Sequence, residues 1–246
     1  MSKYNIYRNV RILGSAISCD DKLNSSASAS VLSIKASAYD LSLRNRDLLD
    51  RYSDVYKISN DLSNYTFIPV PIFITNIPNK NGVAFLDTEL DKFYDDIGKK
   101  AYETWIGKPC FVEHKDEDKT AAVGMIFDAV MRPLSGYSIP LRQCWVLWGL
   151  DRTKNLDLTK QIEESEHNYF SMGAKANCFK CSICGAQFKN KPTCMHLKSW
   201  PWMSDCDGQI SCANAVDIVG EEVSYVANPA WVSAESTNKL ELNNNS

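Results

Sequence analysis

Residues 167–185 read HNYFSMGAKANCFKCSICG. In this stretch Ser171 lies among aromatic, apolar and small residues, and a paired-cysteine knuckle starts ten positions later at Cys181. The first half is typical of a strand. The second half is typical of a metal site, because C-x2-C followed by glycine makes a tight turn that presents two thiolates to one ion. The stretch therefore predicts a strand that carries a candidate nucleophile and leads into a metal-binding loop.

The knuckle continues as C-x2-C-x9-C-x-H, which supplies four nitrogen and sulfur ligands for a tetrahedral zinc ion. The predicted ligands are Cys181, Cys184, Cys194 and His196. Because four protein ligands leave no open coordination position, we expect a structural zinc in a small loop inserted over residues 178–200. Cys178 is an alternative ligand, whereas Cys206 and Cys212 are not expected to bind the ion.

The bulk composition indicates a globular chain without a strong electrostatic preference. Of the 246 residues, 44% are hydrophobic and 23% are charged, and the net charge is −3, so we expect no specific nucleic-acid or membrane partner. The cysteine count is nine, an odd number, and the N-terminus has no apolar core, which favours a reducing compartment over secretion. The most apolar run, FIPVPIFI at 67–74, is too short to span a bilayer.

Two segments are expected along the chain. Residues 1–66 are interpreted as an N-terminal extension with a Ser- and Ala-rich loop at 16–38 and one amphipathic helix. Apolar residues at helical spacing indicate that helix: Leu41, Leu48, Tyr52 and Val55 or Tyr56. Residues 67–246 are interpreted as the main domain. It opens with the strand TFIPVPIFIT, which Pro69 and Pro71 restrict to a sheet edge or an irregular start.

Short strand-like runs dominate the main domain, so a mainly β or α+β fold is predicted. These runs include CFVEH, AAVGMIFDAVM, QCWVLWGL and AVDIVGEEVSYVA. A long helix is predicted over 86–105 from one apolar stripe of six residues: Leu86, Leu90, Phe93, Ile97, Ala101 and Trp105. The polar segment LDLTKQIEESEH at 156–167 predicts a surface helix.

A serine becomes a nucleophile when a base, usually histidine, removes its proton. Of the three histidines, His196 is better explained as a zinc ligand. His167 lies four residues from Ser171, about 13 Å along a strand, so the two side chains would not converge. His114, 57 residues before Ser171, could lie on a neighbouring strand, and elimination selects it as the candidate base. Tyr169 replaces the first glycine of G-x-S-x-G, which argues against an α/β-hydrolase.

Four blocks of sequence, in order over residues 67–235, resemble the prohead (head-maturation) proteases of tailed phages, which are serine proteases related in fold to herpesvirus assemblins. NKNGVAFLDTELDKFYDD resembles the segment before the base. WIGKPCFVEHKDEDKTAAVGMIFDAVM resembles the block with the catalytic histidine. YFSMGAKANCFKCSICG resembles the V-S-M-G nucleophile block and its C-x-I-C-G knuckle, although Phe170 replaces a more usual β-branched residue. GEEVSYVANPAWVSA resembles the closing E-x-S-x-V-x-x-P-A block.

The resemblance implies a role for each candidate residue. Ser171 would be the nucleophile and His114 the base. Glu222 is the first choice for the group that orients the base, with Asp128 and Asp217 as alternatives. The implied α+β fold is a barrel-like, mainly antiparallel protease core with surrounding helices and the zinc loop as an insertion.

A member of this family would be a serine endopeptidase that cleaves scaffold and major capsid proteins within the assembling head, in the host cytoplasm. Self-association into a homo-oligomer is an open alternative to a monomer. The rival interpretation is a noncatalytic head or scaffold protein that keeps the protease fold and its zinc. A zinc-ribbon nucleic-acid module is disfavoured, because no dense Lys/Arg patch with interleaved aromatic residues surrounds the knuckle.

Overall fold

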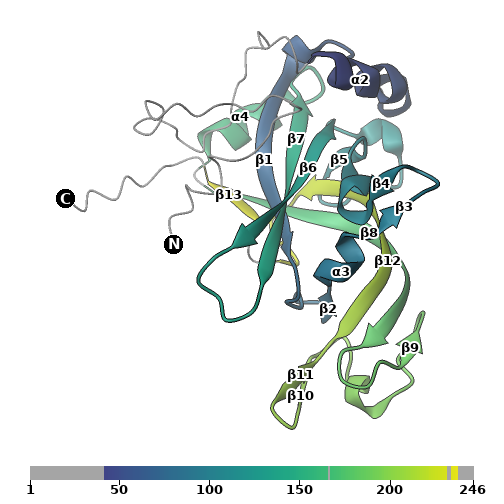
Figure 1. Ribbon diagram of the computed structural model, residues 1–246. Coiled ribbons are helices and arrows are strands. Elements are labelled where there is room, and N and C mark those ends of the chain that lie inside the picture. The colour runs from purple at the N-terminus through teal and green to yellow at the C-terminus, as the bar shows by residue number, and fades with distance from the viewer. Residues whose placement is uncertain (1–41, 166, 232–233, 238–246) are drawn as a thin grey trace.

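The computed structural model describes residues 42–165, 167–231 and 234–237. The predicted loop at 16–38 and Leu41 lie outside these residues. The described residues form one mixed, mostly antiparallel sheet with few helices, so the α+β class is confirmed (Figure 1). In spatial order the strands are β1 (Tyr65–Ile74), β7 (Leu141–Asp151), β6 (Gly124–Leu134), β5 (Pro109–Val112), β12 (Ala213–Tyr225), β8 (His167–Cys181) and β13 (Glu235–Thr237).

The pairing of neighbouring strands is antiparallel except between β5 and β12. Two short strands join the sheet beside this path. β2 (Val83–Ala84) runs parallel to β12, and β9 (Gln187–Phe188) pairs with β8. β12 and β8 therefore each pair with three strands, more than any other described strand.

The predicted edge strand is confirmed, but the predicted barrel does not close. β1 ends the strand order, and its pairing with β7 shifts register between Pro71 and Phe73. β1 also lies in contact with β8 and β13 from the other end of the order, yet no ladder of hydrogen bonds joins them in the described residues. Pro69 and Pro71 have no backbone N–H, so β1 cannot offer a full row of donors to a closing strand.

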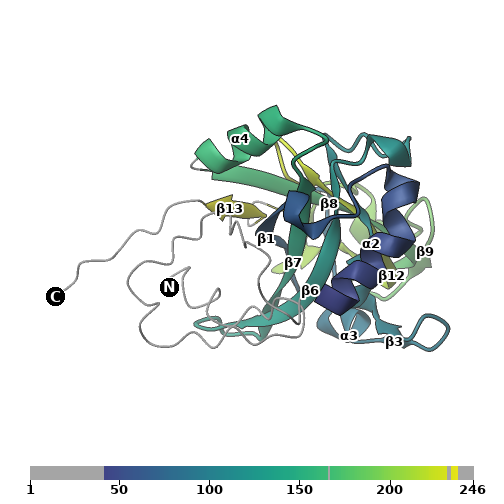
Figure 2. The same cartoon turned by 90° about the horizontal axis from the view of Figure 1, so that it is seen from above.

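Two longer helices flank the β1–β7–β6 end of the sheet: α2 (Ser42–Tyr56) and α4 (Leu156–Glu164) (Figure 2). Leu49 and Tyr56 of α2 are buried in the main hydrophobic core, and the Tyr56 hydroxyl donates to the Gly107 carbonyl at 2.9 Å. The predicted boundary between residues 66 and 67 stays a prediction. α4 confirms the predicted surface helix, and the Asn155 side chain caps its N-terminus.

The prediction of one long helix over 86–105 is wrong. This segment forms four short elements: α3 (Asp87–Leu90), β3 (Phe93–Tyr94), β4 (Lys99–Lys100) and the 3-10 helix η3 (Ala101–Trp105). Gly98 adopts a φ of 63° between the two strands, a left-handed conformation that ends a helix. Phe93 and Ile97 are 57% and 48% exposed, so they do not belong to a buried stripe. The helical spacing of the apolar residues was misleading, because these residues belong to separate elements.

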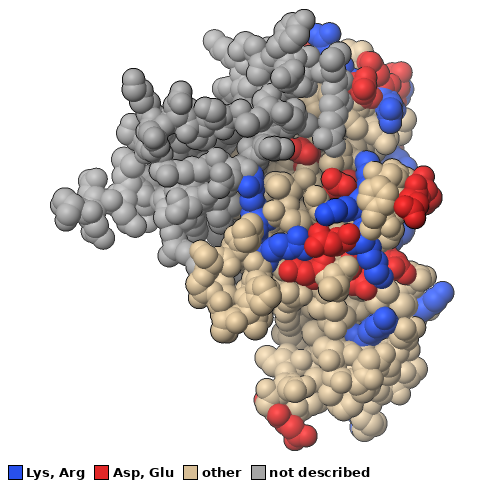
Figure 3. All heavy atoms as spheres, in the orientation of Figure 1, with Lys and Arg blue, Asp and Glu red and all other residues tan. Residues whose placement is uncertain are grey.

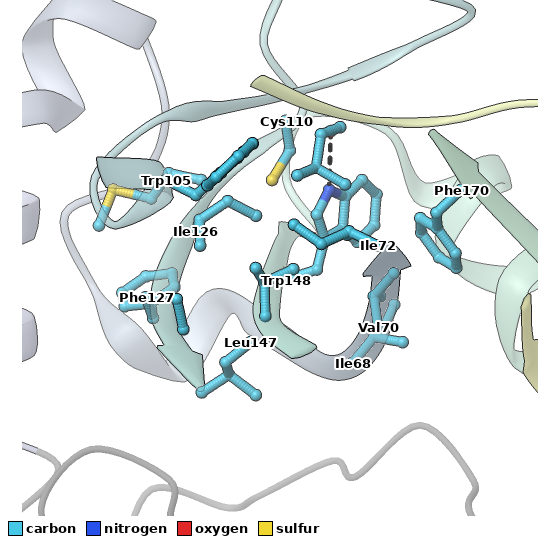
Figure 4. Close-up of a cluster of buried hydrophobic side chains, with 14 of the residues drawn as sticks. Ile68, Val70, Ile72, Trp105, Cys110, Ile126, Phe127, Leu147, Trp148 and Phe170 are labelled. Carbon is cyan, nitrogen blue, oxygen red and sulfur yellow. Dashed lines mark hydrogen bonds between the residues drawn. The ribbon is translucent and has the colours of Figure 1, made fainter. Parts of the chain in front are cut away.

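The main core lies between β1, β7 and β6 and the β5–β12–β8 half of the sheet (Figure 4). Trp148 of β7 is fully buried, and its indole N–H donates to the carbonyl of Val223 in β12 at 3.1 Å. The Phe170 ring of β8 packs edge-on against Trp148 with 5.3 Å between the ring centroids. These contacts tie the middle of β12 and the start of β8 to the most buried part of the sheet.

A small lobe projects beyond the sheet where β8 and β12 extend together (Figure 1). It contains β9, the 3-10 helix η5 (Met195–Leu197) and the hairpin of β10 (Ser204–Cys206) and β11 (Gln209–Ser211). Its own small core is formed by Cys181, Phe188, Leu197 and Ala213. This lobe contains the predicted metal loop.

Charged side chains of both signs alternate in a band across α3 and the β3–β4 hairpin (Figure 3). Arg142 pairs with Asp87 at 3.0 Å and with Asp91 at 2.7 Å, and Lys92 pairs with Glu89 at 2.7 Å. The lower end of this face, towards the small lobe, carries few charges (Figure 3). Within the described residues, no helix combines the length and apolarity needed to cross a membrane.

Substitution of Gly124 tests the close packing of β6 against β7. A Cβ atom at this position would lie 1.8 Å from the Gly149 carbonyl oxygen of β7, where no side-chain movement can relieve the overlap. We expect Gly124→Ala to lower the free energy of unfolding by about 3 kcal/mol, measured by urea denaturation. Gly98→Ala is the control, because a Cβ there meets no atom within 4 Å and adds only the left-handed strain, about 1 kcal/mol. Equal losses for the two variants would contradict the β6–β7 packing.

Candidate functional site

The register between β12 and β8 places four polar or small residues on one face. Ser224 of β12 lies opposite Ser171 of β8, and Glu222 lies opposite Gly173. Residues two apart in a strand share a face, and diagonal neighbours across an antiparallel pair lie about 7–8 Å apart. A β-bulge between Gly220 and Glu222 sets this register. Without the extra residue, Glu222 would point to the opposite face.

The bulge is held by the 3-10 helix η3. The Gly220 amide donates to the Thr104 hydroxyl at 2.7 Å, in a buried position. A Cβ atom on Gly220 would lie 2.4 Å from the Trp105 ring, so only glycine fits against this indole. The bulge therefore depends on a packing contact between distant segments.

His114 reaches the same face from the end of β5. β5 runs parallel to β12 as far as the pair formed by Val112 and Tyr225. Glu113 and His114 then adopt φ angles of 53° and 52°, which is unusual for two consecutive residues other than glycine. Glu113 secures this turn, since its amide donates to the Tyr225 carbonyl at 2.9 Å and its carboxylate accepts from the Ala227 amide at 2.8 Å. Backbone strain of this kind is often found at functional sites.

His114 and Glu222 form a hydrogen-bonded pair. The distance from Nδ1 of His114 to Oε1 of Glu222 is 2.9 Å. The second oxygen of Glu222 accepts a hydrogen bond from the Ser224 hydroxyl. Glu222 is only 2% exposed, so both oxygens of this buried carboxylate have partners. With Nδ1–H directed to the carboxylate, Nε2 of neutral His114 is the nitrogen that can accept a proton.

The pair raises the pKa of His114 above its usual value near 6.5. The hydrogen bond to Glu222 is the main cause, burial opposes it, and the charges of Glu222, Asp116 and Glu113 add to the increase. Because the folded-state pKa is raised, the charged pair stabilises the fold below the unfolded-state pKa. That contribution is lost as the pH rises through the folded-state value. The neutral, proton-accepting form of His114 is therefore reached at a higher pH than for an unperturbed histidine.

Gly173 makes room for Glu222. A Cβ atom on Gly173 would lie 2.6 Å from Oε1 of Glu222, the oxygen that meets His114. No role for Gly173 or Ser224 was predicted from the sequence. Their spacing is the available signal, because each lies two residues from a candidate, Ser171 and Glu222 respectively. Residues at that spacing on a strand share its face.

Ser171 and His114 line one cavity of about 250 Å³. No hydrogen bond joins the Ser171 hydroxyl to the His114 ring in the part of the chain that the structure describes. In serine enzymes without substrate this bond is often long and tightens in the Michaelis complex. The lining also includes Asn79, from the turn that precedes β2, Val83 of β2, and Trp231. The structure thus brings the candidate base to Glu222 and places the candidate nucleophile in the same cavity.

The two alternative carboxylates lie elsewhere. Asp217 pairs with Lys92 at 2.9 Å and accepts from the Asn177 side chain at 3.3 Å, and these contacts lower its pKa. Asp128 lies on β6 opposite Leu147 of β7 and does not line the cavity. Neither carboxylate is bonded to His114, whose carboxylate partner is Glu222.

The predicted metal ligands converge in the small lobe. The ligand atoms of Cys181, Cys184, Cys194 and His196 all lie within 4.8 Å of one another. Two thiolates bound to one zinc ion at about 2.3 Å lie roughly 3.8 Å apart in a tetrahedron, so the cluster has the dimensions for a metal ion. Cys178, Cys206 and Cys212 are not members of the cluster.

Local backbone geometry favours a thiolate at Cys181. Gly185 adopts a φ of 72°, which lets its amide donate back to the Cys181 carbonyl at 2.9 Å. Burial acts to raise the pKa of the Cys181 thiol, but hydrogen bonds from the backbone amides of Cys184 and Ile183 and from the Cys194 and Cys184 side chains together lower it. Nδ1 of His196 is buried without a hydrogen-bond partner in the described residues. A bound metal ion would satisfy this nitrogen.

The small lobe and the cavity share a wall. Phe179 lines the cavity, and its ring centroid lies 5.6 Å from that of Phe188 and 6.1 Å from that of Trp200 in the lobe. The Trp200 indole donates to the Gly82 carbonyl at 3.3 Å. A Cβ atom on Gly82 would lie 2.4 Å from the Pro201 carbonyl oxygen. The turn at residues 79–83 is therefore held in place by contacts with the small lobe.

The chain was compared with protein-family models, curated proteins and solved structures, and none matches it. The assignment of a function consequently rests on the geometry of the site and on the sequence blocks quoted above.

The geometry predicts how the His114 pKa responds to substitution. Glu222→Gln removes the carboxylate that stabilises the imidazolium, so the His114 pKa should fall, as followed by NMR titration of the imidazole signals. Gly173→Ala should lower it too, because the added methyl group displaces Oε1 of Glu222. Glu221→Gln is the matched control, since Glu221 pairs with Lys175 at 2.7 Å and not with His114. An unchanged pKa in Glu222→Gln would refute the pairing.

Proposed function

We propose that this chain is a serine endopeptidase in which Ser171 is the nucleophile, His114 the general base and Glu222 the group that orients and stabilises the base. The observation that carries the proposal is the 2.9 Å bond from Nδ1 of His114 to the buried Glu222. This bond leaves Nε2 of a cavity-lining histidine as the proton acceptor, in the cavity that also contains Ser171.

The reaction follows from these roles. As the Ser171 oxygen attacks the scissile carbonyl carbon, its proton passes to Nε2 of His114, and the imidazolium is stabilised by Glu222. His114 then gives that proton to the leaving amine as the C–N bond breaks, which leaves an acyl ester on Ser171. In the second half, His114 removes a proton from water, the hydroxide attacks the ester, and the proton returns to Ser171. The charge on Glu222 is unchanged throughout.

A polypeptide substrate is supported by the free edge of β8. On that edge β13 pairs with residues 167–169 and β9 with residues 179–180, so residues 171–178 have no strand partner there in the described chain. The cavity includes Met172, Ala174 and Ala176 from this stretch. An extended peptide can use the unpaired backbone groups of a strand edge for main-chain hydrogen bonds.

The substrates that we propose are the scaffold and major capsid proteins of a tailed phage, cleaved within the assembling head in the host cytoplasm. The support is the ordered resemblance of four sequence blocks to the prohead proteases. The resemblance and the site involve the same residues, because Ser171, His114 and Glu222 each lie in one of those blocks.

We further propose that the cluster of Cys181, Cys184, Cys194 and His196 holds one structural zinc ion. Three thiolates and one imidazole are a typical zinc ligand set, and the chain itself fills all four positions. The ion would fasten the lobe that braces the cavity wall. It would take no part in the chemistry at Ser171.

The function predicts a specific loss on truncating the nucleophile. Ser171→Ala should abolish cleavage of co-expressed scaffold and capsid proteins, measured by mass spectrometry, while the protein stays folded. The hydroxyl makes no hydrogen bond in the described chain, so its removal leaves no buried polar group unpaired. His114→Ala should cause a similar loss, and the double variant should be no worse than either, because the residues act as a unit.

Ser199→Ala is the control for Ser171→Ala, because Ser199 is an exposed serine of the small lobe. It should cleave like the unsubstituted protein. If Ser171→Ala retains full cleavage, the enzyme assignment is wrong. Absence of cleavage and of Ser171 labelling by a fluorophosphonate in the unsubstituted protein would favour the noncatalytic head or scaffold protein.

The zinc site predicts coupled losses of metal, order and activity. Purified, reduced protein should contain about one zinc per chain by elemental analysis. Cys184→Ser should remove it and make residues 178–212 sensitive to proteolysis. Activity should fall by about 100-fold if the braced wall moves by roughly 1 Å. Cys206→Ser, in the same lobe but outside the cluster, should keep the zinc. A zinc-free preparation with full activity would show that the metal has no role.

A further inference from the structure

The side chain of Asn79 is a buried amide in the wall of the cavity. It belongs to the turn between β1 and β2, is 7% exposed and lines the cavity together with Ser171 and His114. Asparagine is seldom buried unless its polar atoms are bonded, because desolvating an unpaired amide is costly. The hydrogen bonds of this side chain are therefore informative.

One end of the Asn79 amide is fully used and the other is free. Oδ1 accepts from the backbone amides of Asn81 at 2.9 Å and Val83 at 3.1 Å. Two donors at this end fix the orientation of the amide, so the NH2 group points the other way. Nδ2 donates to no group in the described chain, and it is not sealed from solvent. A residue that lines the cavity thus carries an oriented pair of N–H donors with no partner in the described chain.

The turn that carries Asn79 is rigidly held on both sides. Gly82 donates to the Asn79 carbonyl at 3.0 Å, and its own carbonyl accepts from the Ala213 amide at 2.9 Å and from the Trp200 indole. On the other side, the Lys80 amide donates to the Ala230 carbonyl at 3.2 Å. Because these bonds exist before any substrate enters, binding to Nδ2 would require little reorganisation.

The turn is attached to the sheet through Val83 of β2. Val83 pairs with Ala213, which is opposite Cys181 of β8. Cys181 is ten residues along β8 from Ser171, about 33 Å in an extended strand. Val83, at one end of the turn, is thus anchored towards the end of β8 that enters the small lobe. A donor that meets a substrate carbonyl other than the scissile one contacts a part of the substrate that does not change during the reaction.

We propose that Nδ2 of Asn79 donates a hydrogen bond to a main-chain carbonyl of the substrate, so that Asn79 positions an extended peptide along the free edge of β8. This inference rests on the proposed endopeptidase function and names a binding contact for it. A main-chain carbonyl is an acceptor that every polypeptide substrate provides, whatever its side chains. The contact is equal in the ground state and the transition state, so its loss should raise KM and leave kcat nearly unchanged.

The test uses Asn79→Asp in the full chain. A carboxylate keeps the oxygen that accepts from Asn81 and Val83, so the turn is retained, but it replaces the N–H donors by an acceptor. Asn81→Asp is the matched control, because it adds the same charge in the same cavity wall and leaves the Asn79 donors in place. The melting temperatures of the unsubstituted protein, Asn79→Asp and Asn81→Asp should agree within a few degrees.

Two phosphorus reagents separate binding from chemistry. Each is attacked by the Ser171 oxygen, which loses its proton to His114 while fluoride or phenoxide leaves phosphorus. Diisopropyl fluorophosphate reaches only the reacting centre. An acetyl-tetra-alanyl diphenyl phosphonate also extends along the cavity, and its small side chains suit a lining that includes Ala174, Ala176 and Ala215. Rates of Ser171 labelling are followed by mass spectrometry.

We expect Asn79→Asp to slow labelling by the peptidyl reagent about tenfold or more and labelling by the small reagent less than about twofold. Asn81→Asp measures the effect of a negative charge in the same cavity wall, so its rate of peptidyl labelling should stay about fivefold or more above that of Asn79→Asp. Equal slowing by both substitutions would assign the effect to charge and overturn the inference. Unchanged peptidyl labelling in Asn79→Asp would also overturn it. If neither reagent labels Ser171 in the unsubstituted protein, the endopeptidase proposal fails and this inference with it.

Discussion

The antiparallel ladder of β8 and β12, with its single bulge between Gly220 and Glu222, is the constraint on which the candidate site depends. Side chains alternate along a strand, so one extra residue in β12 decides which face Glu222 occupies. The bulge depends on contacts with a segment that is distant in the sequence. It is held by η3, where Thr104 accepts from the Gly220 amide and the Trp105 ring leaves no space for a side chain on Gly220. The packing of one short helical turn therefore determines whether Glu222 can meet His114.

The bulge places a charged carboxylate where water does not reach, which by itself is unfavourable by several kcal/mol. Glu222 is stabilised by His114 on one oxygen and by the Ser224 hydroxyl on the other. The same charge affects its buried neighbour Cys110, where burial and then Glu222 raise the pKa of the thiol. A protonated, buried thiol is unreactive. Of the nucleophilic groups near Glu222, Ser171 is the one that lines the cavity.

Features that depend on local chemistry could be predicted from the sequence, whereas those that depend on distant packing could not. Pro69 and Pro71 predict an edge strand because proline lacks an N–H, and four ligands within one short loop predict a metal cluster. The helical spacing of apolar residues over 86–105 led to a wrong prediction, because the left-handed Gly98 ends any helix and the segment forms a hairpin followed by a 3-10 helix. Glu222 and Ser224 are recognisable as same-face residues, but the left-handed turn that brings His114 to them depends on contacts with Tyr225 and Ala227.

A single strand carries both the candidate nucleophile and the first metal ligand, which gives a physical reason for their proximity in the sequence. Ser171 lies in the first part of β8, and Cys181 is its last residue. On one edge of β8, residues 171–178 have no strand partner in the described chain, and such an edge is accessible to a substrate but poorly restrained. The lobe restrains its far end, because the Phe179, Phe188 and Trp200 rings pack together there. A metal ion bound by the proposed cluster would add a cross-link to a core that has few apolar residues of its own. The unpaired edge of β8 could then keep its conformation without a neighbouring strand.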